Sequence, residues 1–314
     1  MGLLILLLTG LVLCLVVGTA ALVYTTLHPV RRTYGHALAQ GKPADPADVG
    51  LNAQSVEFRF HDGSASPGWL IEGADAAGPV IVVTHGWSSS RIMQIERAAQ
   101  LRRCASLVVL YDMRGHGDST ASICRLGTTE VDDLLEVLEQ VPVGHCPVVL
   151  YGSSMGAGIS IAAAARPATQ PVAAVIAEGP YRYGLEPIAG HLRCMKYPVQ
   201  PMTGLAGLCL AARLGGFGGF DRAKHASRLA CPLLILHGTA DRISSIESAR
   251  QIAAAAAKSE LVEFEGADHE HLIELDESRY LWAVERLLVD VGDRRRPAPC
   301  PTPSMTTAAI SAAM

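Results

Sequence analysis

The chain begins with a long apolar stretch. From Gly2 to Val23 no residue is charged, and the first charged side chain of the sequence is that of Arg31. A helix of these 22 residues, at about 1.5 Å per residue, would span ~33 Å and could cross the hydrocarbon core of a bilayer. We therefore predict a transmembrane anchor over residues 1–27. A cleaved signal peptide is the alternative, with a possible cleavage site at Gly18-Thr19-Ala20, although no Lys or Arg precedes the apolar run.

The charges that flank this stretch predict its orientation. Arg31 and Arg32 follow it, and nothing basic precedes it. Positive charge at the end of a span favours the cytoplasmic side, so we expect the long C-terminal part of this single-pass membrane protein in the cytoplasm.

The pattern then changes to that of β-strands. Residues 28–54, rich in Pro, Gly, Ala and Asp, are predicted to be a linker. Ser55–Phe60 alternates polar and apolar residues, as a half-exposed edge strand does. A turn at His61-Asp62-Gly63 and a returning strand at Pro67–Glu72 complete an expected antiparallel hairpin.

Short apolar runs without alternation follow, and they indicate strands buried on both faces of a parallel sheet. These strands are expected at 80–83, 107–110, 148–150, 172–176, 233–236 and 261–264. Helices are expected between and after them at 93–103, 129–140, 155–165, 245–258 and 277–291. The alternation predicts one α/β domain over residues 55–292, with a doubly wound, mostly parallel sheet of about eight strands.

The alternation is interrupted between the strands near 176 and 232. Helical stretches at 185–197 and 205–214 fall in this interval. We predict a small cap at about 181–230, because long insertions at the functional edge of a sheet tend to carry substrate contacts. Residues 293–314 contain Pro and Thr without any period, and are predicted to be a disordered tail.

Composition supports the membrane prediction and argues against other classes. The chain is 49% hydrophobic and only 18% charged, which is apolar for a soluble protein. A net charge of −4 without a basic stripe gives no reason to expect a nucleic-acid partner. The eight cysteines show no C-x-x-C spacing, so neither a zinc site nor a redox motif is indicated. Most of them are expected in core packing, which fits a reducing compartment, although their even number also permits disulfides.

One short motif indicates nucleophilic chemistry. Gly152-Ser153-Ser154-Met155-Gly156 reads G-x-S-x-G between an expected strand and an expected helix. In that setting the central serine stands on a sharp elbow with its hydroxyl exposed above the sheet edge. Glycine at both ends permits an approach of strand and helix that a Cβ would obstruct. Ser154 is the candidate nucleophile. The five residues alone also fit a plain Gly/Ser turn, which a chain with 30 glycines can produce by chance.

Two later strands are followed by a candidate base and a candidate acid. His269 comes just after the last expected strand, and Asp241 just after the strand before it. The carboxyl ends of parallel strands meet at one edge of a sheet, so both residues should lie where Ser154 emerges. His271 is the alternative base and Glu178 the alternative acid. Asp241 could also serve only as a turn or N-cap residue.

Stabilising the oxyanion that forms on a carbonyl requires two backbone N–H groups. We expect one from Met155, directly after the nucleophile, and one from Trp87, in the loop His85–Ser90 after the third expected strand. His85 stands at the strand end, a position that fits packing of this loop better than proton transfer.

Together these features resemble the α/β-hydrolase fold superfamily, over about residues 55–291. The order Ser154, Asp241, His269 is the order of that superfamily. Asp112-Met113-Arg114-Gly115-His116-Gly117-Asp118-Ser119 looks like its D-x-R-G-x-G-x-S loop, which is structural in the family. Within the superfamily, the lead-in 33–62 looks like bacterial membrane-anchored or dipeptidyl-peptidase-like hydrolases.

The resemblance implies acyl transfer to water through a serine ester, without a metal or an organic cofactor. Dehalogenases of this fold have aspartate at the elbow, so dehalogenation is disfavoured. We expect a carboxylesterase-like enzyme acting on a small-molecule or lipid-like acyl substrate. A peptidase is an alternative, although no acidic pair or large added domain that would hold a substrate amine is recognisable. A lipase or thioesterase also fits, because the anchor keeps the site near acyl lipids. Outside the enzymes, a membrane-tethered binding protein without turnover would have the same fold.

Overall fold

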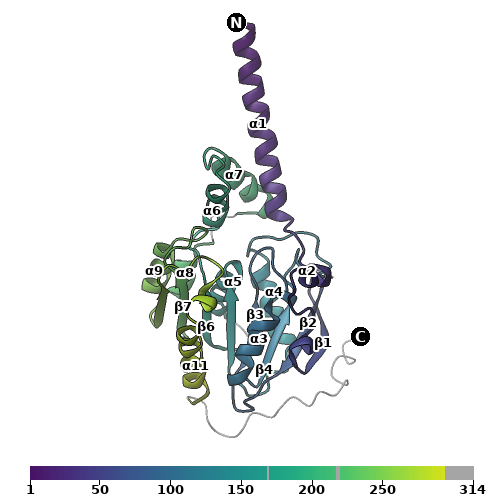
Figure 1. Cartoon of the computed structure of the whole chain (residues 1–314), viewed down its shortest axis with the longest axis vertical. Coiled ribbons are helices and arrows are strands. Elements are labelled where there is room, and N and C mark those ends of the chain that lie inside the picture. The colour runs from purple at the N-terminus through teal and green to yellow at the C-terminus, as the bar shows by residue number, and fades with distance from the viewer. Residues whose placement is uncertain (168–169, 217–219, 294–314) are drawn as a thin grey trace.

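The protein is described by a computed structural model that covers residues 1–167, 170–216 and 220–293 (Figure 1). The tail predicted to be disordered lies, from residue 294 on, outside the described residues.

Eight strands of the described chain form one sheet, in the order β1-β2-β4-β3-β5-β6-β7-β8. They are β1 (Ala53–Arg59), β2 (Ala65–Glu72), β3 (Val80–Thr84), β4 (Leu107–Tyr111), β5 (Val148–Ser153), β6 (Val172–Glu178), β7 (Leu233–Gly238) and β8 (Ser259–Phe264). β2 pairs antiparallel with β1 and with β4, and every other neighbouring pair is parallel. The predicted hairpin and the mostly parallel sheet of about eight strands are confirmed.

Helices connect most of the strands, and further helices precede the first strand and follow the last strand in the sequence. They are α1 (Gly2–Leu27), α2 (Tyr34–Ala39), α3 (Ile95–Leu101), α4 (Glu130–Gln140), α5 (Met155–Ala164), α6 (Glu186–Cys194), α7 (Met202–Leu214), α8 (Arg222–Ala226), α9 (Ile246–Ala255), α10 (Leu272–Leu275) and α11 (Glu277–Asp293). Short 3-10 turns at Ile92–Gln94 and Arg102–Cys104 flank α3, so the single helix expected at 93–103 is divided into three pieces.

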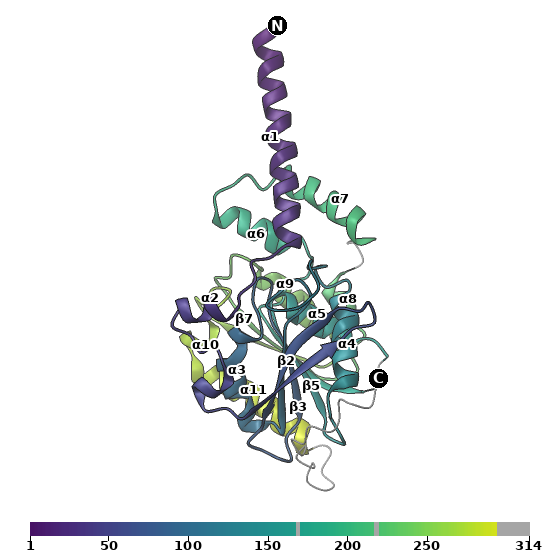
Figure 2. The ribbon, with the colours of Figure 1, turned by 90° about the vertical axis from the view of Figure 1, so that its right-hand side faces the viewer.

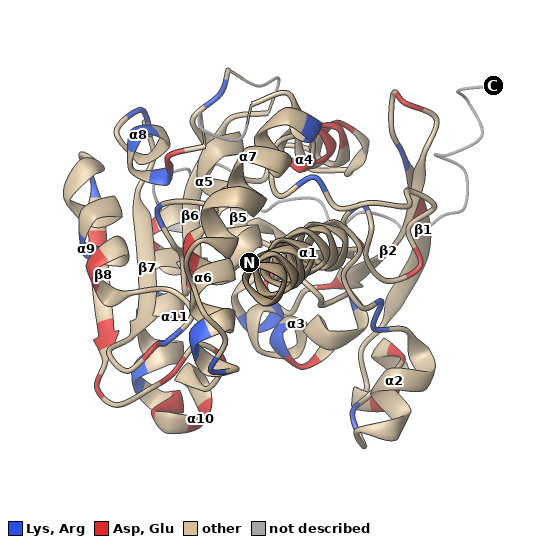
Figure 3. Ribbon diagram, turned by 90° about the horizontal axis from the view of Figure 1, so that it is seen from above, with Lys and Arg blue, Asp and Glu red and all other residues tan. Residues whose placement is uncertain are grey.

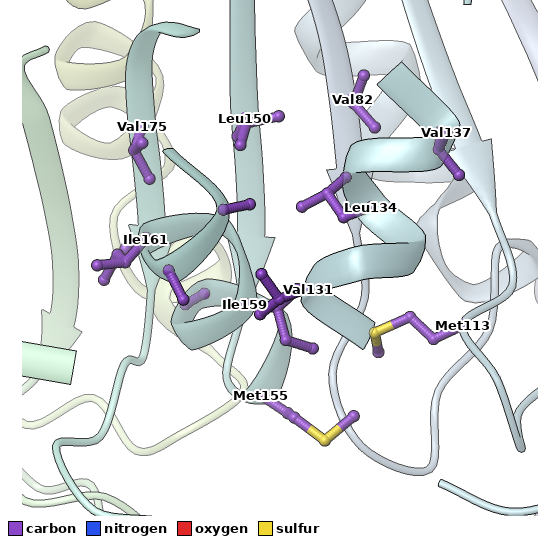
Figure 4. Packing of buried hydrophobic residues seen from close by; sticks show 14 of the residues in the cluster. Val82, Met113, Val131, Leu134, Val137, Leu150, Met155, Ile159, Ile161 and Val175 are labelled. Carbon is purple, nitrogen blue, oxygen red and sulfur yellow. The ribbon is translucent and has the colours of Figure 1, made fainter. Parts of the chain in front are cut away.

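The core has two layers, one on each face of the sheet. Alternate residues of β3 point to opposite faces, so Val82 packs in one cluster and Ile81 in the other. One cluster includes residues of α4, α5, α8 and α9, and the other includes residues of α3 and α11. Figure 4 shows the first layer, where Leu134 of α4 and Ile159 of α5 lie against the sheet. Burial on both faces explains why the central strands are continuous apolar runs.

The helix α1 extends away from this domain, with α6 and α7 beside its base (Figures 1 and 2). It has 26 residues and is long and apolar enough to cross a membrane; a signal sequence would pass the same test. As far as Val17, most of its exposed side chains are Leu, Ile and Val. Its last turn differs, because Thr26 and Leu27 are buried against the domain.

Residues 28–54 are more ordered than the predicted linker. They contain α2 and a 3-10 turn at Pro46–Val49, and Ala37, Ala44 and Leu51 are buried in the layer that includes α3. The small Ala side chains allow the backbone of this segment to pack closely on the domain.

The expectation that the cysteines are mostly core residues is wrong for half of the six free ones in the described chain. Cys124 and Cys231 are buried, whereas Cys14, Cys194 and Cys209 are exposed. These three belong to α1, α6 and α7. Of these helices, α1 and α7 contribute other residues, Leu27, Leu210 and Leu214, to the core.

Candidate active site

Ser154 stands on a strained turn between β5 and α5. Its φ of 52° and ψ of −111° lie where a residue with a Cβ is disfavoured. The turn is possible because both flanking residues are glycine. A Cβ on Gly152 would lie 2.3 Å from the carbonyl oxygen of Gly156, and one on Gly156 would lie 2.1 Å from that of Thr84. The turn therefore fits closely against β3, and its strain exposes the serine hydroxyl.

The structure brings Ser154, His269 and Asp241 into one hydrogen-bonded chain. The Nε2 atom of His269 lies 2.8 Å from the Ser154 Oγ, and its Nδ1 lies 2.7 Å from the Asp241 Oδ2. The Asp241 side chain is only 1% exposed and that of His269 is 13% exposed. Such a chain orients the imidazole so that Nε2 can accept the hydroxyl proton.

Asp241 also caps its own turn. Its Oδ1 accepts hydrogen bonds from the backbone N–H groups of Ile243 at 2.8 Å and Ser244 at 2.9 Å. The Ser244 hydroxyl donates to Oδ2 at 2.8 Å. The turn-capping role and the contact with His269 therefore coexist, because different lone pairs of one carboxylate serve them.

The electrostatics of the pair favour an ionised acid beside a basic imidazole. Burial by itself would raise the pKa of Asp241, but the hydrogen bond and charge of His269 and the Ser244 backbone bond together lower that pKa. Burial by itself would lower the pKa of His269, but the hydrogen bond and the negative charge of Asp241 outweigh it and raise that pKa above its usual value. His269 is thus a stronger base than an unperturbed histidine side chain.

Glu178 and His271, the alternative acid and the alternative base, are not part of this hydrogen-bonded chain. The Glu178 carboxylate accepts hydrogen bonds from the buried hydroxyls of Tyr151 and Tyr280, and it forms an ion pair with Arg97 at 3.2 Å. Its backbone carbonyl accepts the Ser154 N–H at 2.7 Å. Glu178 therefore supports the elbow, while His269 bonds to Asp241. His271 begins α10 and lines the same cavity, but the ring that reaches Ser154 is that of His269.

The two expected oxyanion donors flank the serine. Met155 is the first residue of α5, and Trp87 lies on the loop after β3, where a Cβ added to Gly86 would be 3.4 Å from the Ser154 Cβ. Within the described ranges, neither the Trp87 nor the Met155 backbone N–H donates to a protein acceptor. Both amides are therefore available to an oxyanion.

His85 and the Asp112–Ser119 loop have structural roles. His85 Nδ1 bonds the Gly86 carbonyl at 2.8 Å, while its Nε2 accepts the Met113 N–H at 3.0 Å. Burial lowers its pKa to about 4, so the ring is neutral and joins the two loops. In the second loop, the Asp112 carboxylate accepts the backbone N–H groups of Arg91 at 2.7 Å and Asp118 at 2.9 Å.

A cavity of about 1200 Å³ opens at Ser154. Its walls include Ile188 and Leu192 of α6 and, unexpectedly, Leu22 and Thr26 of α1. Sequence reasoning missed this contribution of α1, because the whole uncharged stretch was assigned to the membrane. The polar residues Tyr24, Thr25 and Thr26 near its end are a local signal that could have indicated it. In the described part of the chain, no group of three or more His, Cys, Asp or Glu residues is arranged to hold a metal ion.

Comparison with known proteins identifies relatives of the chain. A model described as the Alpha/beta hydrolase family matches residues 80–281. The lysophosphatidylserine lipase ABHD12 of Danio rerio is 26% identical over 61% of this chain and 50% of its own length. The Rattus norvegicus lipase of the same name is 27% identical over 69% of this chain and 56% of its own length. The chain thus spans about half the length of the curated relatives it matches.

Solved structures share the fold. An esterase from Pyrococcus furiosus superposes with a TM-score of 0.67 at 19% identity, covering 84% of this chain and 98% of its own. An esterase from a Rhodococcus species reaches a TM-score of 0.56 at 19% identity, covering 76% of this chain and 99% of its own.

The close packing of the elbow makes a prediction about stability. Gly156→Ala should destabilise the protein by about 1–3 kcal/mol, because the added methyl group overlaps the Thr84 carbonyl. Gly35→Ala in α2 is the matched control, since a Cβ there meets nothing within 4 Å. Thermal unfolding of the detergent-solubilised full chain measures both. Equal melting temperatures for the two variants would contradict the packing described here.

The raised pKa of His269 predicts how Ser154 reactivity depends on pH. Only the neutral imidazole accepts the serine proton, so labelling by a fluorophosphonate should slow as the pH falls, with a midpoint above the usual pKa of a histidine side chain. Asp241→Asn removes the charge that raises this pKa, and should move the midpoint to lower pH while reducing the plateau rate by roughly 10³–10⁴-fold. Asp268→Asn, which changes an exposed neighbour of His269, is the control and should leave the midpoint in place. An unshifted midpoint in Asp241→Asn would show that Asp241 does not control the histidine.

Proposed function

The chain belongs to the alpha/beta hydrolase family, and on that premise we propose that it is a serine hydrolase that cleaves a carboxylic ester through an acyl-enzyme on Ser154. The observation that carries the proposal is the continuous hydrogen-bonded chain from Ser154 through His269 to Asp241. A turn of Gly and Ser without a catalytic role would need neither the strained φ of Ser154 nor a buried carboxylate two hydrogen bonds away.

The proposed reaction has two halves. Ser154 Oγ attacks the ester carbonyl carbon while His269 Nε2 takes the hydroxyl proton. The tetrahedral intermediate collapses, the carbon–oxygen bond to the alcohol breaks, and His269 gives its proton to the departing alcohol. Water then attacks the acyl-enzyme with His269 again accepting a proton. The acid is released, and the proton returns to Ser154.

Asp241 and the two backbone amides stabilise the charges of this reaction. The buried Asp241 carboxylate faces the imidazolium that forms when His269 takes the proton. The N–H groups of Trp87 and Met155 donate to the carbonyl oxygen as it becomes negative. These donors are fixed before substrate binds, so little reorganisation is needed in the transition state.

We propose a lipid-like ester as the substrate. Two observations support this: the relatives named as lysophosphatidylserine lipases, and the apolar residues of α1 and α6 in the cavity wall. A single-chain lipid ester has an acyl chain that suits this wall.

We also propose how the chain is organised around the membrane. Residues 1–27 would anchor it, residues 55–292 would form the hydrolase domain, and residues 181–230 would form the cap. Arg31 and Arg32 directly follow α1, and their positive charge supports a cytoplasmic location of the hydrolase domain.

Loss of the nucleophile tests the reaction. Ser154→Ala should reduce hydrolysis of p-nitrophenyl esters and lysophospholipids by at least about 10³-fold, because only background binding and oxyanion stabilisation remain. The same assay with acyl-CoA and aminoacyl amides separates an esterase from a thioesterase or a peptidase. Hydrolysis by Ser154→Ala at a near-wild-type rate would contradict the mechanism, and a wild-type protein that cleaves amides preferentially would contradict the ester assignment.

Protease protection tests the orientation. A cytoplasmic hydrolase domain should survive external protease on intact cells and be digested once the cells are permeabilised. Digestion of the domain on intact cells would place it on the opposite side of the membrane.

A further inference from the structure

The end of α1 is fixed to the active site by several hydrogen bonds. The Trp87 indole N–H donates to the Thr26 carbonyl at 3.0 Å, and the Cys124 N–H donates to that of Leu27 at 2.8 Å. Just after the helix, Arg31 donates to the carbonyls of Ser119 at 2.6 Å and Ala121 at 2.5 Å. The anchor therefore has a defined position on the domain, unlike a helix on a flexible tether.

Trp87 joins this attachment to the cap. Its ring packs edge-on against His191 of α6, with 6.0 Å between the ring centroids. The same residue carries one of the two proposed oxyanion amides. The anchor, the cap and the loop over Ser154 thus meet at one side chain.

The cavity at Ser154 is continuous with this junction. Leu22, Thr25 and Thr26 of α1 line it together with Ile188 and Leu192 of α6. Seen from above, the exposed length of α1 carries no charged residue, whereas charged residues lie on the surrounding elements (Figure 3). One wall of the catalytic cavity is therefore the lower end of the helix that is apolar enough to cross the bilayer.

The helix α7 adds to the exposed apolar surface of α1. The S-methyl group of Met202 lies 3.1 Å from the position of a Cβ on Gly18, so α7 packs directly against α1. The helix α7 also exposes Leu205 and Leu208, the latter 71% exposed, and its only charged residue is Arg213 near its end. An exposed apolar patch continuous with a membrane-spanning helix lies most favourably in lipid.

We propose that α1, α6 and α7 form an entrance that faces the bilayer, through which the acyl chain of a membrane lipid reaches Ser154, with α1 as a wall of the acyl-chain site. This inference rests on the proposed ester hydrolysis. A lipid that enters here keeps its chain in contact with Leu22, Ile188 and Leu192 while its ester carbonyl reaches Ser154. The anchor then determines which acyl chains the enzyme accepts, in addition to holding it at the membrane.

Chain-length selectivity tests the role of α1 as a wall. In the full-length protein, the indole of Leu22→Trp should fill the proposed path of the substrate's acyl chain. We therefore expect the ratio of kcat/KM for p-nitrophenyl palmitate to that for p-nitrophenyl acetate to fall by at least about tenfold. Val16→Trp adds the same bulk to a part of α1 that is 61% exposed and outside the cavity wall, and should leave the ratio unchanged. An unchanged ratio in Leu22→Trp overturns the inference.

Two further measurements make the result decisive. Fluorophosphonate labelling reports whether Leu22→Trp still has a folded site; if it does not, Thr25→Trp, which changes an exposed residue of the same wall, gives the deciding ratio. A wild-type protein that hydrolyses neither ester overturns the proposed function itself, a result distinct from an unchanged ratio.

Fluorescence quenching tests the contact of α7 with lipid, and this measurement does not depend on catalysis. In vesicles of brominated phosphatidylcholine, the indole introduced by Leu208→Trp should be quenched by the lipid. The indole introduced by Val289→Trp, on the exposed surface of α11 far from α1, should not be (Figure 1). Quenching of the position 208 indole by aqueous acrylamide, without quenching by the brominated lipid, would place α7 in water and overturn the entrance.

Discussion

The active site depends on one backbone constraint, the strained positive-φ conformation of Ser154 between β5 and α5. A serine in this conformation costs energy, and the turn is held by surrounding packing that admits no Cβ at Gly152 or Gly156. Because β5 lies between β3 and β6, the elbow is supported on both sides, by the β3 loop and by the carbonyl of Glu178. The strained residue is therefore the one whose hydroxyl points into the cavity and meets His269.

A second junction, at Trp87, connects this elbow to α1. Its neighbour Gly86 lies close to Ser154, its indole donates a hydrogen bond to the last turn of α1, and its ring touches α6. The arrangement gives the anchor a physical route to influence catalysis, because a movement of α1 would displace the loop that carries a proposed oxyanion donor.

Much of the fold was predictable from local sequence, while the relation of its parts was not. The buried runs such as Val80–Val83 indicated parallel strands, and the positions of Ser154, Asp241 and His269 after β5, β7 and β8 put them at one edge. These signals are local or follow from sheet topology. The docking of α1 was missed because it depends on contacts between distant segments, such as Arg31 with the carbonyl of Ser119. The packing of residues 28–54 on the domain was missed for the same reason, since Ala37 is buried by neighbours that are distant in the sequence.

The central claim is that Ser154 is the nucleophile, held by the elbow and activated by His269. Peptide mapping by mass spectrometry after reaction of the full chain with a fluorophosphonate tests it most directly. The account predicts a single adduct, on the peptide that contains Ser154, and none in protein first denatured so that the elbow and the His269 contact are lost. An adduct on a different residue, or equal labelling of folded and denatured protein, would contradict it.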